Sequence, residues 1–107
     1  MTVFLGSDIF RGSGYGSGHP LNIPRVWPVI DICRAQGWLP DSDFETVPPA
    51  TKEELECFHT RAYIDALLDA ETNQALDETR SKRHKIGTHS NPIYPEIYRR
   101  PATAAKA

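Results

Sequence analysis

The sequence has few of the features that mark membrane, secreted or nucleic-acid-binding proteins. Within its first ten residues the longest apolar run is Val3-Phe4-Leu5, far shorter than a signal-peptide core or a membrane-spanning helix. A net charge of −2 and a pI near 6.0 create no field that would attract nucleic acid or an anionic membrane. We therefore expect a soluble, cytoplasmic protein without nucleic-acid or membrane partners.

Cysteine is also scarce. The two cysteines, Cys33 and Cys57, lie in apolar helical contexts with no leader before them, so we interpret them as reduced, buried thiols. A chain of 107 residues is long enough for one domain, residues 1–107, which buries roughly 60 to 70% of its unfolded surface.

The first half of the chain predicts a strand followed by a helix. Residues 2–7 are β-branched and aromatic and predict one buried strand, and residues 8–24 predict a loop. A helix packed on one face should begin near Trp27, because Pro28 is tolerated only in the first turn, and should end at Gly37. Its apolar stripe follows the i, i+3, i+4, i+7 pattern through Val26, Val29, Ile30 and Cys33.

The second half predicts further helices. Residues 44–47 form a second short strand, and Thr51 with Glu54 is a capping box that opens a helix reaching about residue 58. A helix to about residue 71 follows, with an apolar face of Tyr63, Ile64, Leu67 and Leu68. We interpret residues 72–92 as a mobile loop, and expect Pro101 to kink or end a last helix. Helices with parallel-capable strands indicate an α/β fold.

The most specific segment is residues 14–25, with the sequence GYGSGHPLNIPR. Its glycines allow a phosphate-binding interpretation, but such a loop opens directly into a helix and carries a Gly-Lys-Ser/Thr ending. Here His19-Pro20 and Pro24 intervene, which disfavours nucleotide binding. A surface loop without function stays open as an alternative.

Together with residues 55–64 (LECFHTRAYI) and 87–94 (GTHSNPIY), this loop resembles, in the same order, segments of the zinc-dependent deacetylases. That family includes histone deacetylases, acetylpolyamine amidohydrolases and acetoin utilisation proteins. The resemblance runs from about Thr2 to the C-terminus. It implies a partial arginase/deacetylase-like α/β fold, with mostly helices and one or two short strands. In such enzymes zinc polarises an acetyl amide and a metal-bound water attacks.

The resemblance covers only the N-terminal portion of the family. No residue here matches its Asp-x-His metal ligands, its distant Asp, its tandem catalytic histidines or its Tyr. We therefore expect no catalytic residue, no metal site and no cofactor in this chain, since zinc belongs to the full-length family. Whether the chain is a fragment or a complete gene product, and which acyl substrate a relative would use, stay open.

The resemblance assigns four site residues. Tyr15 and His19 would lie at the substrate entrance, and Ser90 in the second rim loop. Arg25 would be the arginine of the internal acetate channel, because a guanidinium stays charged when buried and grips a carboxylate through two hydrogen bonds. The alternative for Arg25 is a solvated side chain, or one paired with Asp8, Asp31 or Glu54.

Ser90 departs from the family pattern. Peptide-directed members place an Asp there, and a hydroxyl cannot make the same charge-assisted contact. The resemblance therefore favours a small or polyamine-type acetylated substrate over a peptide.

The remaining clusters of polar residues indicate neither a zinc site nor a nucleic-acid-binding site. The four histidines, His19, His59, His84 and His89, lack the convergent spacing of a zinc site, and we interpret His59 as a helix-end histidine bonded to backbone. The basic run at residues 80–85 lacks interleaved aromatics, which indicates a solvated loop.

Two hypotheses follow. The chain is part of a metal-dependent deacetylase that is inactive alone, or it is a self-associating interaction module derived from that fold. A free-standing copy would leave apolar surface and a strand edge uncovered, so we expect at least a dimer.

Overall fold

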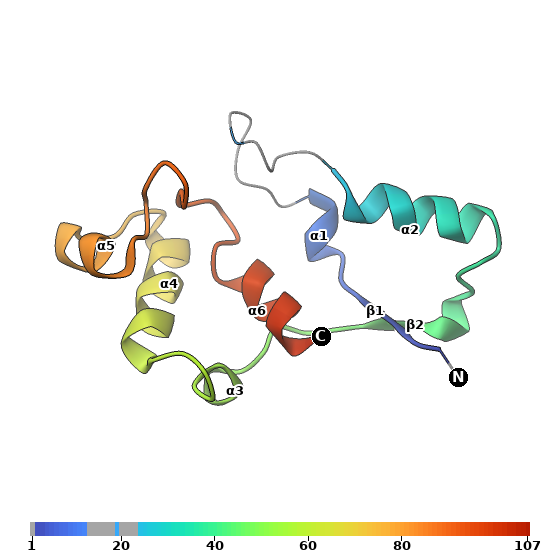
Figure 1. Cartoon of the computed structure of the whole chain (residues 1–107), viewed down its shortest axis with the longest axis horizontal. Helices are drawn as coiled ribbons and strands as arrows, with labels where there is room; N and C mark the ends of the chain where they lie inside the picture. The colour runs from blue at the N-terminus through green and yellow to red at the C-terminus, as the bar shows by residue number, and fades with distance from the viewer. Residues whose placement is uncertain (1, 13–18, 20–23) are drawn as a thin grey trace.

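The computed structural model describes residues 2–12, 19 and 24–107. Two short strands and several helices follow one another along an elongated molecule that measures 50 × 33 × 18 Å (Figure 1). Their bounds are β1 Phe4–Gly6, α1 Ile9–Gly12, α2 Val26–Ala35, η1 Asp41–Asp43, β2 Phe44–Thr46, α3 Lys52–Leu55, α4 Arg61–Asn73, α5 Glu78–His84 and α6 Arg99–Lys106.

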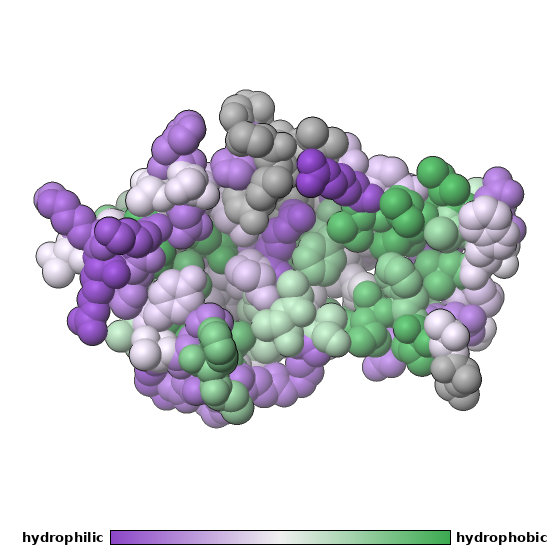
Figure 2. Space-filling view, in the orientation of Figure 1, coloured by the Kyte–Doolittle hydropathy of each residue, from purple (hydrophilic) through white to green (hydrophobic). Residues whose placement is uncertain are grey.

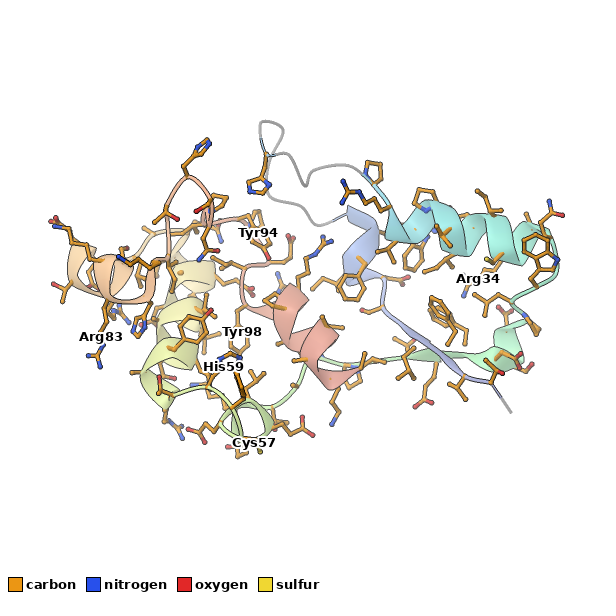
Figure 3. The ribbon with its side chains drawn as sticks, viewed as in Figure 1. Arg34, Cys57, His59, Arg83, Tyr94 and Tyr98 are labelled. Carbon is orange, nitrogen blue, oxygen red and sulfur yellow. The ribbon has the colours of Figure 1, made fainter. Side chains whose placement is uncertain are left out.

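The N-terminal half is a two-layer unit in which α1 and α2 cover one face of a parallel pair of strands. Phe4 of β1 is in register with Phe44 of β2, and their rings stack with centroids 5.6 Å apart. The guanidinium of Arg34 on α2 lies 4.6 Å from the Phe44 ring centre and joins the two layers (Figure 3). The predicted α/β class and both predicted strands are confirmed.

Burial in this half differs from the sequence prediction. The first strand was expected to be buried, but Phe4 and Leu5 are exposed, because the sheet has no strand beyond these two and no helix on its second face in the part of the chain that the structure describes. Residues 8–24 were expected to be loop throughout, yet α1 forms within them; residues 13–18 and 20–23 lie outside the described part.

Helix α2 begins and ends where the sequence predicts. Pro28 lies in its first turn, and Gly37 follows it with a φ of +74°, a conformation that favours glycine. The predicted buried stripe is correct only in part, however. Ile30 is buried as predicted and Cys33 is half-buried, whereas Val26 and Val29 are exposed and Trp27 is buried in their place.

The capping box at α3 is confirmed on both sides. The Glu54 amide donates to Thr51 Oγ1 at 3.2 Å, and the Thr51 amide donates to Glu54 Oε2 at 2.9 Å. The regular helix ends at Leu55, earlier than expected, and its last turn is closed by the His59 amide donating to the Leu55 carbonyl at 2.9 Å.

The prediction of a mobile loop over residues 72–92 is wrong, because α5 forms inside it. Asp77 caps this helix by accepting a hydrogen bond from the Arg80 amide at 3.0 Å. Lys85 ends the helix in the left-handed conformation with a φ of +57°. Because α5 has no buried residues, its N-cap and its ion pairs stabilise it.

Helix α6 corrects a second expectation. Pro101 neither kinks nor ends the helix, since it occupies the third helical position. The first backbone N–H groups of a helix have no intrahelical acceptor, so proline loses nothing there.

The hydrophobic core lies in the C-terminal half. It is a cluster of side chains from α4 and the chain after α5, namely Ala66, Ala70, Ile86, Tyr94 and Ile97. The radius of gyration is 15.8 Å, compared with about 13 Å for a compact domain of this length. Cys33 is half-buried and Cys57 is exposed, and both are free thiols, so the expected burial is wrong for both.

Candidate functional site

The residues assigned by resemblance come from both halves of the molecule. Arg25 stands exposed immediately before α2, and Ser90 is exposed in the loop after α5. No hydrogen bond or ion pair joins these two residues in the described part of the chain. His19 is half-buried, and Tyr15 lies outside the described residues.

Arg25 does not use the carboxylates considered for it. Asp31 instead accepts from Arg11 at 3.1 Å, and Glu54 pairs with Lys106. Among the described residues Arg25 forms no ion pair with Asp8 either. Arg25 is therefore a solvated cation in this chain.

The loop that carries Ser90 is closed by backbone and amide hydrogen bonds. The Gly87 amide donates to the Asn91 carbonyl at 2.8 Å, and the Asn91 amide donates to Thr88 Oγ1 at 3.1 Å. Asn91 also donates through Nδ2 to the Lys85 carbonyl at 2.9 Å. Asn91, which sequence reasoning did not single out, thus shapes the loop and leaves Ser90 exposed.

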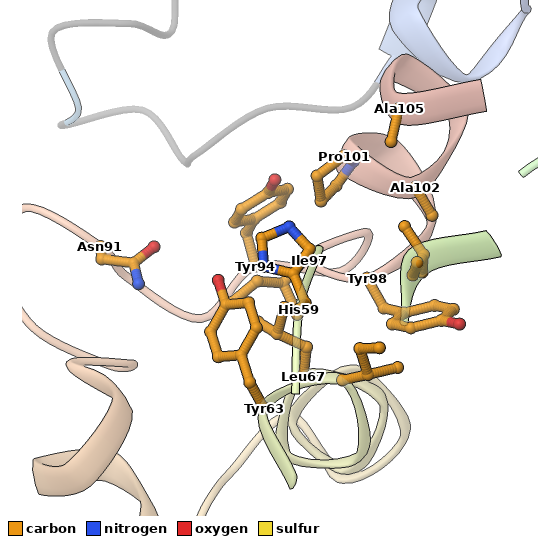
Figure 4. A pocket seen from close by; sticks show the side chains of 12 residues that line it. His59, Tyr63, Leu67, Asn91, Tyr94, Ile97, Tyr98, Pro101, Ala102 and Ala105 are labelled. Carbon is orange, nitrogen blue, oxygen red and sulfur yellow. The ribbon is translucent and has the colours of Figure 1, made fainter. Parts of the chain in front are cut away.

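A groove of about 200 Å³ runs between α3, α4, α6 and the segment that leads into α6 (Figure 4). Aliphatic side chains form much of its lining, and four aromatic residues face it: His59, Tyr63, Tyr94 and Tyr98. The His59 ring lies 4.9 Å from Phe58 and 5.3 Å from Tyr63, measured between ring centres. His59 does follow a helix end, as predicted, but its ring packs among aromatic rings.

Sequence reasoning did not find this groove. The only available signal was the pair of aromatic residues at i, i+4, found at His59 with Tyr63 and again at Tyr94 with Tyr98. The four residues meet only through the packing of α4 against residues 91–98. Chemically, the groove can hold a small apolar group beside phenol hydroxyls and an imidazole.

The basic run at residues 80–85 is more ordered than expected. Arg80 lies 2.6 Å from Asp69 and bonds to Asp77 as well. The Arg80 amide and guanidinium lower the pKa of Asp77, and the two carboxylates raise the pKa of Arg80. Arg83 projects outward from α5 (Figure 3). Two of the basic side chains, Arg80 and Lys82, are therefore committed to ion pairs rather than available to phosphate.

The second charged contact joins α3 to α4. Lys52 Nζ lies 2.9 Å from Asp65, and this hydrogen bond lowers the pKa of Asp65 and raises that of Lys52. Both groups are partly exposed, so the pair orients the two helices more than it stabilises them.

Within residues 2–12, 19 and 24–107, no three His, Cys, Asp or Glu side chains are grouped as metal ligands. None of the helices in those ranges combines the length and the apolar character that crossing a membrane requires.

Known proteins with similar sequence or structure point to one family. No family model matches the chain. The acetoin utilization protein AcuC of Bacillus subtilis (strain 168) is 27% identical over 97 residues, which span 91% of this chain and 25% of AcuC. Crystal structures of an HDAC homolog from Aquifex aeolicus and of an HDAC homolog complexed with SAHA each superpose with a TM-score of 0.89 and 31% identity.

The superposition covers 97% of this chain and 28% of each solved chain. The chain thus spans about a quarter of the length of the proteins it matches. In sequence and in fold, it resembles one part of the deacetylase family that includes the histone deacetylase homologs and the acetoin utilisation proteins.

Proposed function

We propose that this chain is the substrate-entrance part of a metal-dependent deacetylase and is inactive by itself. The observation that carries the proposal is the superposition on an HDAC homolog over 97% of the chain, at 31% identity. Because the chain spans 28% of that homolog, the chemistry of the complete enzyme would come from outside these residues.

The residues of this chain do not fit a zinc site. The described residues group no three ligand side chains, and residues 13–18 and 20–23 contain no His, Cys, Asp or Glu. A catalytic zinc needs three protein ligands and an open position. The role proposed for this chain is therefore to shape the entrance, with the metal held elsewhere.

In this proposal Tyr15, His19 and Ser90 border the entrance, and Arg25 faces the product carboxylate. Arg25 is exposed at the start of α2, so its guanidinium is available to an acetate ion that the rest of the enzyme would release. Ser90 is exposed and uncharged, which favours a small or polyamine-type acetylated substrate over a peptide held by a carboxylate.

A chimera tests the role of this segment. The chain replaces the aligned segment of the Aquifex aeolicus HDAC homolog, and binding of SAHA is measured by calorimetry, with a version lacking the segment as the control. We expect the chimera to bind SAHA and the deletion to lose binding. Loss of binding in a folded chimera would contradict the proposal.

The substrate preference is tested in the same chimera. We expect acetylspermidine to be deacetylated faster than an acetyl-lysine peptide, and Ser90→Asp to shift the ratio of kcat/KM toward the peptide by about tenfold or more, the scale of one charge-assisted hydrogen bond. An unchanged ratio of kcat/KM values would show that Ser90 does not contribute to substrate recognition.

The isolated chain supplies the complementary test. After dialysis we expect no stoichiometric zinc and no deacetylation of acetyl-lysine or acetylspermidine. One tightly held zinc per chain, or turnover that a chelator abolishes, would show that the chain carries its own active site.

A further inference from the structure

The loop that carries Ser90 is anchored at both ends in the hydrophobic core. Ile86, which precedes the loop, is fully buried, and Tyr94, which follows it, is 6% exposed. Both belong to the core cluster, and Ile93 packs against that cluster. Residues 87–91 therefore lie between two fixed points of the chain, and we call them the rim loop.

The rim loop follows a helix that has a hydrophilic surface. Helix α5 contains no buried residue, and Figure 2 shows hydrophilic residues gathered over this end of the molecule (Figure 2). The helix contacts α4 through the ion pair of Arg80 with Asp69 and through the His84 ring, whose centre lies 5.6 Å from that of Tyr63. The last carbonyls of a helix have no intrahelical donor, so the C-cap residue Lys85 needs a donor from elsewhere.

Asn91 supplies this donor and also closes the rim loop. Its Nδ2 donates to the Lys85 carbonyl at 2.9 Å. Its backbone carbonyl accepts from the Gly87 amide at 2.8 Å, and its amide donates to Thr88 Oγ1 at 3.1 Å. A single residue thus joins the end of α5 to the opposite side of the loop.

The backbone at the start of this segment needs such support. Lys85 and Gly87 both have left-handed conformations, with φ values of +57° and +82°. A lysine rarely adopts this conformation, and it persists where surrounding contacts fix it. The bond from Asn91 Nδ2 fixes the peptide group of Lys85, so we expect the rim loop to lose its shape when that bond is removed.

We propose that Asn91 is a positioning residue of the substrate entrance, which fixes its neighbour Ser90 in the place from which the Ser90 hydroxyl contacts the substrate. Ser90 is exposed, and its hydroxyl makes no hydrogen bond to the residues that the structure describes. The backbone of the rim loop therefore sets the place of this side chain. The inference rests on the proposed function, because it requires Ser90 to face the substrate.

The chimera with the Aquifex aeolicus HDAC homolog tests the inference. Asn91→Ala should raise KM for acetylspermidine about fivefold, the scale of one neutral hydrogen bond, and leave kcat unchanged, because a displaced entrance residue weakens ground-state and transition-state binding alike. A merely structural defect would lower the active fraction and with it kcat. The matched control is Asn73→Ala, since Asn73 is an exposed asparagine at the end of α4, and it should change neither constant.

A double-variant cycle shows whether Asn91 acts through Ser90. Ser90→Ala should raise KM by a similar factor, and adding Asn91→Ala should raise it no further. Thr88→Val removes only the Oγ1 acceptor, and the Asn91 amide keeps the Thr88 carbonyl at 3.2 Å, so this variant should raise KM by a smaller factor. Thr88→Val also provides the test if Asn91→Ala does not fold.

The outcomes separate this inference from the proposed function. A chimera that neither binds SAHA nor turns over would contradict the proposed function and the positioning role together. In an active chimera, a KM that neither Asn91→Ala nor Thr88→Val changes would overturn the positioning role alone. So would a fall in kcat in place of a rise in KM, or an equal rise in KM with and without the Ser90 hydroxyl.

Discussion

The Glu71 carboxylate on α4 holds Arg99, at the start of α6, through both of its oxygens. Oε1 accepts from Arg99 Nε at 2.6 Å, and Oε2 accepts from the Arg99 backbone amide at 2.9 Å. Oε2 also accepts from the Tyr98 amide at 2.8 Å. A residue far away in sequence thus caps α6, whose own N-cap residue provides no side-chain hydrogen bond.

Replacing Glu71 with alanine should destabilise the chain by about 2 to 3 kcal/mol. The substitution removes a carboxylate whose side chain is only 11% exposed and leaves two amides at the helix start without their acceptor. Glu71→Gln, which keeps one acceptor oxygen, should lose less. Urea denaturation followed by circular dichroism measures both.

The control for this prediction is Glu78→Ala. Glu78 pairs with Lys82 in an exposed i, i+4 contact, which is worth about 0.5 kcal/mol or less. Equal losses in the Glu71 and Glu78 variants would show that the cap on α6 contributes nothing.

The N-cap hydrogen bond of α5, from the Arg80 amide to Asp77, should be lost in acid. The Arg80 amide and guanidinium lower the pKa of Asp77 from its ordinary value of 3.8. A carboxyl with a lowered folded pKa stabilises the helix fully above its ordinary value, and this contribution is lost as the pH falls through the folded pKa. We expect the Arg80 amide to lose hydrogen-exchange protection below about pH 4.

Asp77→Asn separates this effect from general acid unfolding. Asparagine also caps helices well but carries no charge, so protection of the Arg80 amide in this variant should not depend on the ionisation of residue 77. The same acid-induced loss in both proteins would exclude Asp77 as the cause.

Local patterns predicted the parts of the fold that depend on neighbouring residues. The capping box of Thr51 and Glu54 and the stop at Gly37 need only a few adjacent residues, and both are confirmed. Which face of α2 becomes buried depends on residues that are distant in the sequence. Periodicity identified the helix and the burial of Ile30, but it assigned Val26 and Val29 to the core in place of Trp27.

Helix α5 was missed because no apolar periodicity marks it. It contains no buried residue and depends on the Asp77 cap and on the pairing of Arg80 with Asp69 of α4. The aromatic groove was missed for a related reason, since His59 and Tyr98 come together only in the tertiary structure. Resemblance assigned Arg25 to an acetate channel and Ser90 to a rim loop, and both assignments stay predictions; in this chain the two residues stand on different halves.

Arg25→Ala should leave stability nearly unchanged. Arg25 is exposed, and its candidate partners Asp31 and Glu54 pair with other cations. We expect a change within about 0.5 kcal/mol, which corresponds to a Tm shift below about 4 °C in a domain of this size. A loss on the order of 3 to 5 kcal/mol would instead indicate a buried ion pair.

Gly6→Ala should destabilise the N-terminal half. A Cβ at Gly6 would lie 2.8 Å from Cζ of Phe44 and 3.3 Å from Cε1 of Phe4. The Phe44 ring cannot move aside freely, because it is stacked on Phe4 and lies under the guanidinium of Arg34. We expect a loss of about 1 to 3 kcal/mol, the usual cost of overpacking.

Gly12→Ala is the matched control, since a Cβ there meets none of the described residues within 4 Å and replacing glycine in a compatible conformation stabilises by about 0.4 to 1 kcal/mol. Trp27 and Trp38 are the only tryptophans and both lie in the N-terminal half, so tryptophan fluorescence during urea denaturation reports this half directly. We expect the fluorescence midpoint to fall in Gly6→Ala and to hold or rise in Gly12→Ala. If the midpoint were unchanged in both variants, the close contact between Gly6 of β1 and the Phe44 ring would not determine the spacing of the two strands.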